Sequence, residues 1–373
     1  MNMEYETGKP DNGTSKKAVI RAEESAPFEF GIYTLGDLSP NPLTGQSATA
    51  KQRIREVIDA AVLADEAGID VFGVGEHHRL DFALSSPPVL LAAIAQATKQ
   101  IRLTSATTIL GTADPVRVFE DFATLDLISD GRAEMIAGRG AYIESFPLFG
   151  YELDSYAQLF LEKIKLFLEL NDKERMTWSG QFRTPLNDAE IAPRPVQPKL
   201  PVWIGVGGTP ASAALAGQLG TGMALAILGG NPADFQHLVE VYRQAGLDAG
   251  HQPGGLSVGI TGHCYIAEDS KQARDEFYPH YSYYFSQFMG KPKPSREQFE
   301  QMTGPQTALA VGSPDEIVEK ILMQHELFGH SRFMAQFDIG GVPYAKIATA
   351  IELLAGKVAP AVRKALKTST NQV

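Results

Sequence analysis

Apolar runs of strand length alternate with amphipathic segments, in which apolar residues recur every three or four positions, along most of the chain. Gly68 ends the first amphipathic segment, and Pro115 opens a later one at its first turn, where a missing N–H costs no hydrogen bond. The pattern predicts strands at 28–35, 69–75, 101–110, 133–137, 201–206, 223–228, 256–267 and 333–339. It predicts helices at 49–67, 88–98, from 115, at 156–170, 211–218, 232–245 and 314–328, and from 347.

Eight strands, each followed by a helix, are typical of an α/β fold in which a single parallel sheet closes into a TIM barrel. A doubly wound open sheet is the competing architecture. We expect one catalytic barrel domain over 27–373, preceded by a polar, flexible N-terminal extension at 1–26. Two insertions interrupt this alternation of strands and helices, a proline-rich one at 171–200 and a longer one at 270–312.

The second insertion is rich in aromatic residues at helical spacing. They are Phe277, Tyr278, Tyr281, Tyr283, Tyr284, Phe285 and Phe288. Such a stripe is typical of core packing, but its place between a strand and its helix also suits a lid over an apolar substrate. The sequence leaves both interpretations open.

Composition restricts the environment and the partners of the protein. A net charge of −11 without a dense basic cluster argues against nucleic acid and anionic membrane as partners. The chain has no run of 18 apolar residues and no signal-peptide pattern at its start, so we expect a cytoplasmic protein. Its single cysteine, Cys264, excludes an internal disulfide and fits a reducing compartment.

The tetrapeptide Gly75-Glu-His-His78 is the strongest chemical signal in the chain, because it ends a predicted strand. The carboxyl ends of parallel strands are where such folds keep their chemistry. His77 shares strand parity with Gly73, which aims it into the barrel mouth, where a neutral imidazole can exchange a proton near pH 7. A pair of histidines that only caps the strand is the structural alternative. A metal site is disfavoured, since adjacent strand residues face opposite ways and no His-Glu-x-x-His motif is present.

Two other strand ends carry residues suited to an anion. Gly207, Gly208 and Thr209 precede a helix, where free N–H groups can cradle a phosphate, although a tight turn needs glycine for geometry alone. Pro210 takes the place of the last glycine of G-x-G-x-x-G, so the nicotinamide fingerprint is absent. Arg139, flanked by glycines, is placed to neutralise a phosphate, whereas Glu134 suits a structural ion pair low in the barrel.

These motifs, in this order, resemble the bacterial-luciferase-like flavin monooxygenase family over about residues 28–358. The resemblance rests on Gly75–His78, Asp114-Pro-Val-Arg117 with Asp126, Ser129-Asp-Gly-Arg132, Gly138-Arg-Gly140 and Gly207-Gly-Thr-Pro210. Each motif alone is weak, and the ordered set is specific.

The resemblance implies a barrel that binds flavin mononucleotide (FMN) at its C-terminal face. It gives His77 the catalytic role, with Glu76 in support. It places a non-prolyl cis peptide between Ala106 and Thr107, beneath the flavin ring, and it puts Arg139 and Tyr142 at the flavin, Arg139 toward the phosphate. Gly207, Gly208 and Thr209 match the phosphate loop, although the serine that luciferase has there is not obvious.

The family's reaction implies the remaining partners. Its members use reduced flavin and dioxygen to oxygenate a small organic compound, here an apolar one, and many assemble as homodimers. Without a nicotinamide fingerprint, the electrons come from a separate NAD(P)H-dependent flavin reductase. Some relatives instead use a deazaflavin for hydride transfer, and others bind flavin without turnover, so both alternatives stay open.

Overall fold

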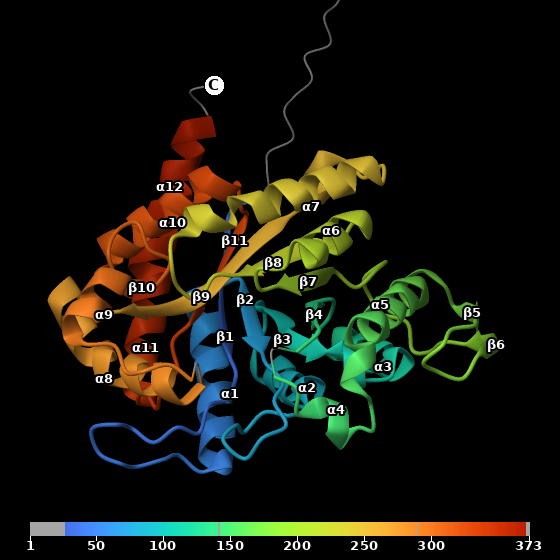
Figure 1. The fold of residues 1–373 in the computed structure, drawn as a ribbon, viewed down its shortest axis with the longest axis horizontal. Coiled ribbons are helices and arrows are strands. Elements are labelled where there is room, and N and C mark those ends of the chain that lie inside the picture. The colour runs from blue at the N-terminus through green and yellow to red at the C-terminus, as the bar shows by residue number, and fades with distance from the viewer. Residues whose placement is uncertain (1–26, 141, 289, 371–373) are drawn as a thin grey trace, which may run out of the picture.

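The computed structural model describes residues 27–140, 142–288 and 290–370, so the predicted extension at 1–26 lies outside the described residues. Eight parallel strands form a closed barrel (Figure 1). They are β1 (Glu29–Thr34), β2 (Val71–Val74), β3 (Arg102–Ile109), β4 (Ala133–Gly138), β7 (Val202–Val206), β8 (Gly222–Ala226), β9 (Val258–Ile266) and β11 (Arg332–Gln336). Pairing runs in chain order, and the β11–β1 and β8–β9 pairings close the ring. The barrel prediction is therefore confirmed, and the open sheet is excluded.

Helices follow the strands and surround the barrel (Figure 1). They are α1 (Ala50–Ala67), α2 (Pro87–Ala97), α3 (Pro115–Ile128), α4 (Ser145–Leu148), α5 (Tyr156–Asp172), α6 (Pro210–Gln218), α7 (Gln236–Asp248), α10 (Pro314–Phe328), α11 (Tyr344–Leu353) and α12 (Ala359–Thr370). Local sequence sets their ends. The Thr49 hydroxyl and Gln52 cap the first turn of α1 reciprocally, and Gly68 ends that helix in the left-handed conformation at φ 81°.

Both predicted insertions are present, and each has its own secondary structure. The first is a hairpin of β5 (Arg175–Trp178) and β6 (Leu186–Glu190), which projects from the barrel (Figure 1). The second holds α8 (Ser270–Phe288), α9 (Arg296–Met302) and the short strand β10 (Ala310–Gly312), which pairs in parallel with the end of β9.

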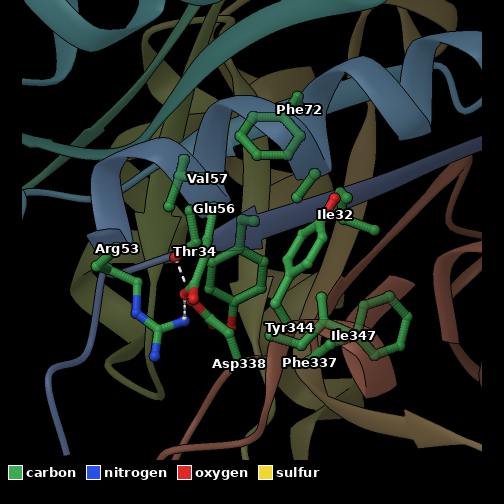
Figure 2. A pocket seen from close by; sticks show the side chains of 12 residues that line it. Ile32, Thr34, Arg53, Glu56, Val57, Phe72, Phe337, Asp338, Tyr344 and Ile347 are labelled. Carbon is green, nitrogen blue, oxygen red and sulfur yellow. Dashed lines mark hydrogen bonds and ion pairs between the residues drawn. The ribbon is translucent and has the colours of Figure 1, made fainter. Parts of the chain in front are cut away.

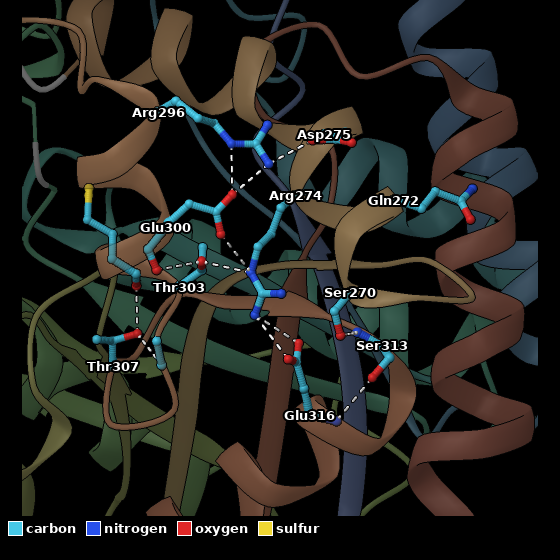
Figure 3. A network of polar contacts seen from close by, with 12 residues as sticks. Ser270, Gln272, Arg274, Asp275, Arg296, Glu300, Thr303, Thr307, Ser313 and Glu316 are labelled. Atoms are coloured by element: carbon cyan, nitrogen blue, oxygen red, sulfur yellow. Dashed lines mark hydrogen bonds and ion pairs between the residues drawn. The ribbon is translucent and has the colours of Figure 1, made fainter.

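The second insertion is fixed to the barrel helices by ion pairs (Figure 3). Arg274 of α8 lies 3.0 Å from Glu316 of α10, and its Nε lies 3.5 Å from Glu300 of α9. Arg296 of α9 reaches back to Asp275 of α8 at 2.7 Å. These contacts join α8, α9 and α10 into one packed unit.

The aromatic stripe of α8 contributes three buried side chains to the core, and Tyr278 and Phe285 pack partly buried against it. Phe277, Tyr281 and Tyr284 are buried, and the Phe277 ring stacks on Tyr265 of β9 at 5.0 Å with an interplanar angle of 11°. Of the two interpretations of this insertion, core packing describes these three side chains. Their burial is the expected outcome for large aromatic surfaces beside a strand end.

An ion-pair cluster occupies the amino-terminal end of the barrel interior. Glu134 of β4 is fully buried between the guanidinium groups of Arg332 and Arg102, with Arg102 Nη2 at 2.9 Å. Burial alone would raise the pKa of Glu134, but the two arginines outweigh it and hold that pKa below its usual range. The predicted structural role of Glu134 is therefore confirmed.

Two further observations concern the described residues as a whole. Cys264 is buried in β9, as a small apolar strand residue would be, and burial raises the pKa of its thiol. Within the described ranges, no helix combines the length and the apolar character needed to cross a bilayer.

Candidate active site at the carboxyl ends of the strands

A layer of apolar side chains closes the barrel interior below its mouth. Strand register puts a layer of apolar side chains on the inner face, and these form one buried cluster: Tyr33, Val71, Ile136, Trp203, Ala224 and Met334. Inner-face positions at or beyond this layer are partly exposed: Ala106 is in register with Ile136, Thr261 is in register with Met334, and Gly205 lies two residues beyond Trp203. A partly exposed residue inside a closed barrel faces accessible space. The apolar cluster is thus a floor, and the site lies above it.

His77 lies against the loop that follows β4. Its ring stacks on Phe82 at 4.1 Å and meets Tyr142 edge-on at 5.1 Å, and its Nδ1 lies 3.4 Å from Glu144 Oε1. Burial lowers the pKa of His77, and the nearby Glu144 carboxylate offsets part of that shift. The structure therefore brings together two predicted site residues, His77 and Tyr142, and keeps the imidazole neutral at pH 7.

The Glu76 carboxylate has partners other than the His77 ring, and its expected support of the catalytic histidine stays a prediction. This carboxylate accepts a hydrogen bond from the Ile109 backbone N–H at 2.8 Å and lies 2.9 Å from His78 Nε2. The reason is strand parity, because Glu76 and His78 share one face and His77 points to the other. The carboxylate beside His77 is Glu144, which sequence reasoning did not identify.

The peptide bond between Ala106 and Thr107 is cis, as the resemblance implies. The Thr107 side chain packs across the strands, so that a Cβ on Gly138 would lie 2.4 Å from Thr107 Oγ1. Gly205 faces the same side chain, and a Cβ there would lie 3.2 Å from Thr107 Cγ2. Glycines at the ends of β4 and β7 thus give Thr107 its place in the mouth.

A candidate anion site lies where β7 leads into α6. Gly208 has φ 126°, which side chains rarely adopt, and a Cβ on Gly207 or Gly208 would meet nothing within 4 Å. Thr209 precedes α6 without a side-chain capping bond, Pro210 has no N–H, and the Ser212 and Ala213 N–H groups both donate to the Thr209 carbonyl. The N–H groups that a ligand could use here are therefore those of the glycine loop and of Ala211. Arg139 Nη2 donates a 2.7 Å hydrogen bond to Ser212 Oγ in that same turn. The predicted phosphate residues therefore converge on one helix terminus.

Ser212 is a site residue that sequence reasoning missed. It lies in the first turn of α6 and is buried. A serine there is the fourth residue after Gly208, and a helical start places it back over the glycine loop. That spacing is the signal that would have identified it.

A small cavity of about 30 Å³ lies outside the mouth, between β1 and the helices α1 and α11 (Figure 2). The Thr34 hydroxyl donates to the Asp338 carboxylate at its edge, and the nearby Asp37 accepts the Gly340 N–H at 2.7 Å. Burial raises the pKa of both aspartates. These bonds tie the loop after β1 to the loop after β11, and the cavity is too small for an organic substrate.

Comparison with known proteins agrees with this geometry. The family model described as luciferase-like monooxygenase matches residues 28–331. The oxygenase component of flavin-dependent trigonelline monooxygenase from Acinetobacter baylyi is 24% identical over 341 residues, which cover 84% of this chain and 91% of that protein. An F420-dependent glucose-6-phosphate dehydrogenase from Amycolatopsis mediterranei is 32% identical over 191 residues, 48% of this chain and 55% of that protein.

A solved structure shares the fold. The oxygenating constituent of 3,6-diketocamphane monooxygenase from Pseudomonas putida, in complex with FMN, superposes with a TM-score of 0.75 at 21% identity. The match covers 90% of this chain and 99% of that chain.

Proposed function

This chain belongs to the luciferase-like monooxygenase family and is an oxidoreductase, and on that premise we propose that it oxygenates a small, mainly apolar organic compound with reduced FMN and dioxygen. The observation that carries the proposal is the arrangement of the mouth. The candidate anion site at the start of α6 and the His77–Tyr142 pair both lie beyond the carboxyl ends of the strands, above an apolar floor. The electrons are supplied by a separate NAD(P)H-dependent flavin reductase, as in two-component oxygenases.

The residues at the mouth fit FMN. Its phosphate would be held by the N–H groups after Gly207 and Gly208, with Thr209 and the Arg139–Ser212 pair beside it. Its ring would lie on the Ala106–Thr107 bond, with Tyr142 at the border. Reduced FMN would supply the electrons with which dioxygen oxygenates the substrate.

His77 is proposed to hold and move the proton of the reaction. Its ring is neutral at pH 7, since burial lowers its pKa, so one nitrogen can accept a proton while Nδ1 lies near the Glu144 carboxylate. The Phe82 stack fixes the plane of the ring. Glu144 is proposed as the positioning residue in the place first given to Glu76.

Hydride transfer with a deazaflavin is the second candidate function. It is favoured by the relationship to the F420-dependent dehydrogenase, which matches about half of the chain. The same anion site would accept the phosphate of either cofactor, so the glycine loop does not separate the two.

The proposal is tested by titrating the purified protein with FMN and with coenzyme F420 and monitoring binding by fluorescence. We expect FMN to bind more tightly. We also expect oxygen uptake in excess of free flavin oxidation when a flavin reductase, NADH and a panel of apolar compounds are added. Binding of F420 alone, with hydride transfer from an alcohol, would support the second candidate, and flavin binding without turnover would indicate a carrier protein.

A further inference from the structure

A buried histidine, His263, lies on the inner face of β9 at the level of the mouth. Strand alternation puts it on the same face as Thr261, which is partly exposed, and the register pairs it with Gln336 of β11. The His263 side chain is 3% exposed. It therefore lies inside the barrel, one inner-face position beyond Thr261 and closed off from solvent.

Both ring nitrogens of His263 are buried without a hydrogen-bond partner among the described residues. The ring has aromatic neighbours, with Tyr281 edge-on at 6.2 Å and Tyr284 edge-on at 5.3 Å. Burial lowers the pKa of His263 to about 4, so at neutral pH the ring offers one donor and one acceptor. Buried polar atoms are almost always satisfied, and leaving two unpaired is costly.

The position of His263 relative to the proposed flavin follows from the strand order. Around the barrel, β4, β7 and β8 separate β3 from β9, so β9 lies directly opposite β3 in a ring of eight. The Ala106–Thr107 bond lies in a partly exposed part of β3. His263 therefore lies across the barrel from the proposed ring site, with the buried Tyr281 and Tyr284 rings beside it.

We propose that His263 is a substrate-recognition residue, whose imidazole hydrogen-bonds a carbonyl or hydroxyl oxygen on an uncharged, ring-containing substrate held between the flavin ring proposed to lie on the Ala106–Thr107 bond and the tyrosines of α8. This inference rests on the proposed function for the location of the flavin. An aromatic wall favours a flat or cyclic compound, and an ion would lose its hydration there without a counter-charge from His263. A site built to hydrogen-bond a substrate oxygen rejects an analogue without that oxygen, because the polar atoms of the site are then left unpaired.

The test compares isosteric probes that differ in one oxygen. Acetophenone and 4-ethylphenol are matched with α-methylstyrene and 4-ethyltoluene, and each is titrated by calorimetry into the protein with and without FMN. We expect the wild type to prefer the oxygenated member by about tenfold or more, the usual value of one hydrogen bond at a buried site. His263→Phe should bind both members of each pair equally, and His263→Gln should keep part of the preference.

His330→Phe is the matched control, because His330 is also a buried histidine but precedes β11 at the opposite end of the barrel. It should keep the full preference. A wild type without preference for oxygenated probes would overturn the inference, as would an unchanged preference in both His263 variants. A third outcome separates the two proposals. If the protein fails to bind FMN, but the wild type prefers the oxygenated probes and His263→Phe does not, the proposed function is contradicted and the role of His263 stands.

Discussion

The Arg139 guanidinium donates a 2.7 Å hydrogen bond to the Ser212 hydroxyl, which joins the end of β4 to the first turn of α6. The guanidinium also lies over the Tyr156 ring at 5.3 Å. It is thereby held at the helix terminus before any anion binds, so little side-chain entropy is lost when one does.

We predict that Arg139→Ala weakens FMN binding by about 1–3 kcal/mol, the usual loss of a charge-assisted hydrogen bond. Ser212→Ala should weaken it by less, because the charge remains. Calorimetric titration with FMN measures both. Arg117→Ala is the control, since Arg117 is exposed and pairs with Glu120 on α3. Equal affinity in wild type and Arg139→Ala would contradict the assignment of the phosphate site.

The two adjacent histidines should differ in their effect on turnover. His77→Asn should lower turnover by ~10²–10⁴-fold, the usual scale for a positioned acid or base, and leave FMN affinity and fold largely intact. His78→Asn should keep most of the activity, because its ring contacts Glu76 and Phe149 rather than Tyr142. Steady-state kinetics on one identified substrate, with FMN titration of each variant, decides between them. Loss of turnover in the His78 variant alone would reverse the assignment.

Glu144→Gln should lower the pKa of His77 further. Burial already lowers it, and the Glu144 carboxylate acts in the opposite direction. The acidic limb of the pH–rate profile should therefore move to lower pH, and the His77 titration followed by NMR should move with it. Glu76→Gln is the matched control, since Glu76 contacts His78. The same shift of the pH–rate profile and of the His77 pKa in Glu144→Gln and in Glu76→Gln would show that Glu144 has no specific effect on His77.

Asp338→Asn should become more stable relative to the wild type as pH rises from 4 to 7. Burial raises the pKa of Asp338 in the folded state, so the unfolded chain loses this proton first and stability falls as pH rises. Asparagine removes that loss and keeps an oxygen for the Thr34 hydroxyl. The gain should be of the order of 1–3 kcal/mol, the usual cost of a poorly compensated buried polar group. Urea unfolding at several pH values measures it.

The exposed Asp59→Asn provides the control for Asp338, because an exposed carboxylate should give nearly parallel stability curves. A relative loss of stability in Asp338→Asn as pH rises would show that the buried carboxylate is stabilising.

The sequence by itself determined the barrel, because the pattern of each strand and helix can be recognised from neighbouring residues alone. Apolar periodicity and end signals such as Gly68 and Pro115 depend on neighbours within one or two turns, and eight such units leave a parallel barrel as the simplest closed arrangement. Strand parity likewise separated His77 from His78, because alternation is a property of the strand itself.

Only the tertiary structure decided which side chains meet. His77 and Glu144 are 67 positions apart, and Arg139 and Ser212 are 73 positions apart, so no local pattern links either pair. The helical character of 270–288 is visible in the sequence, but its burial against β9 depends on how α8 packs on the barrel. The expected support of His77 by Glu76 stays a prediction for the same reason. Which neighbour a carboxylate contacts is set by strand twist and by loops from other parts of the chain, and these exist only once the barrel has closed.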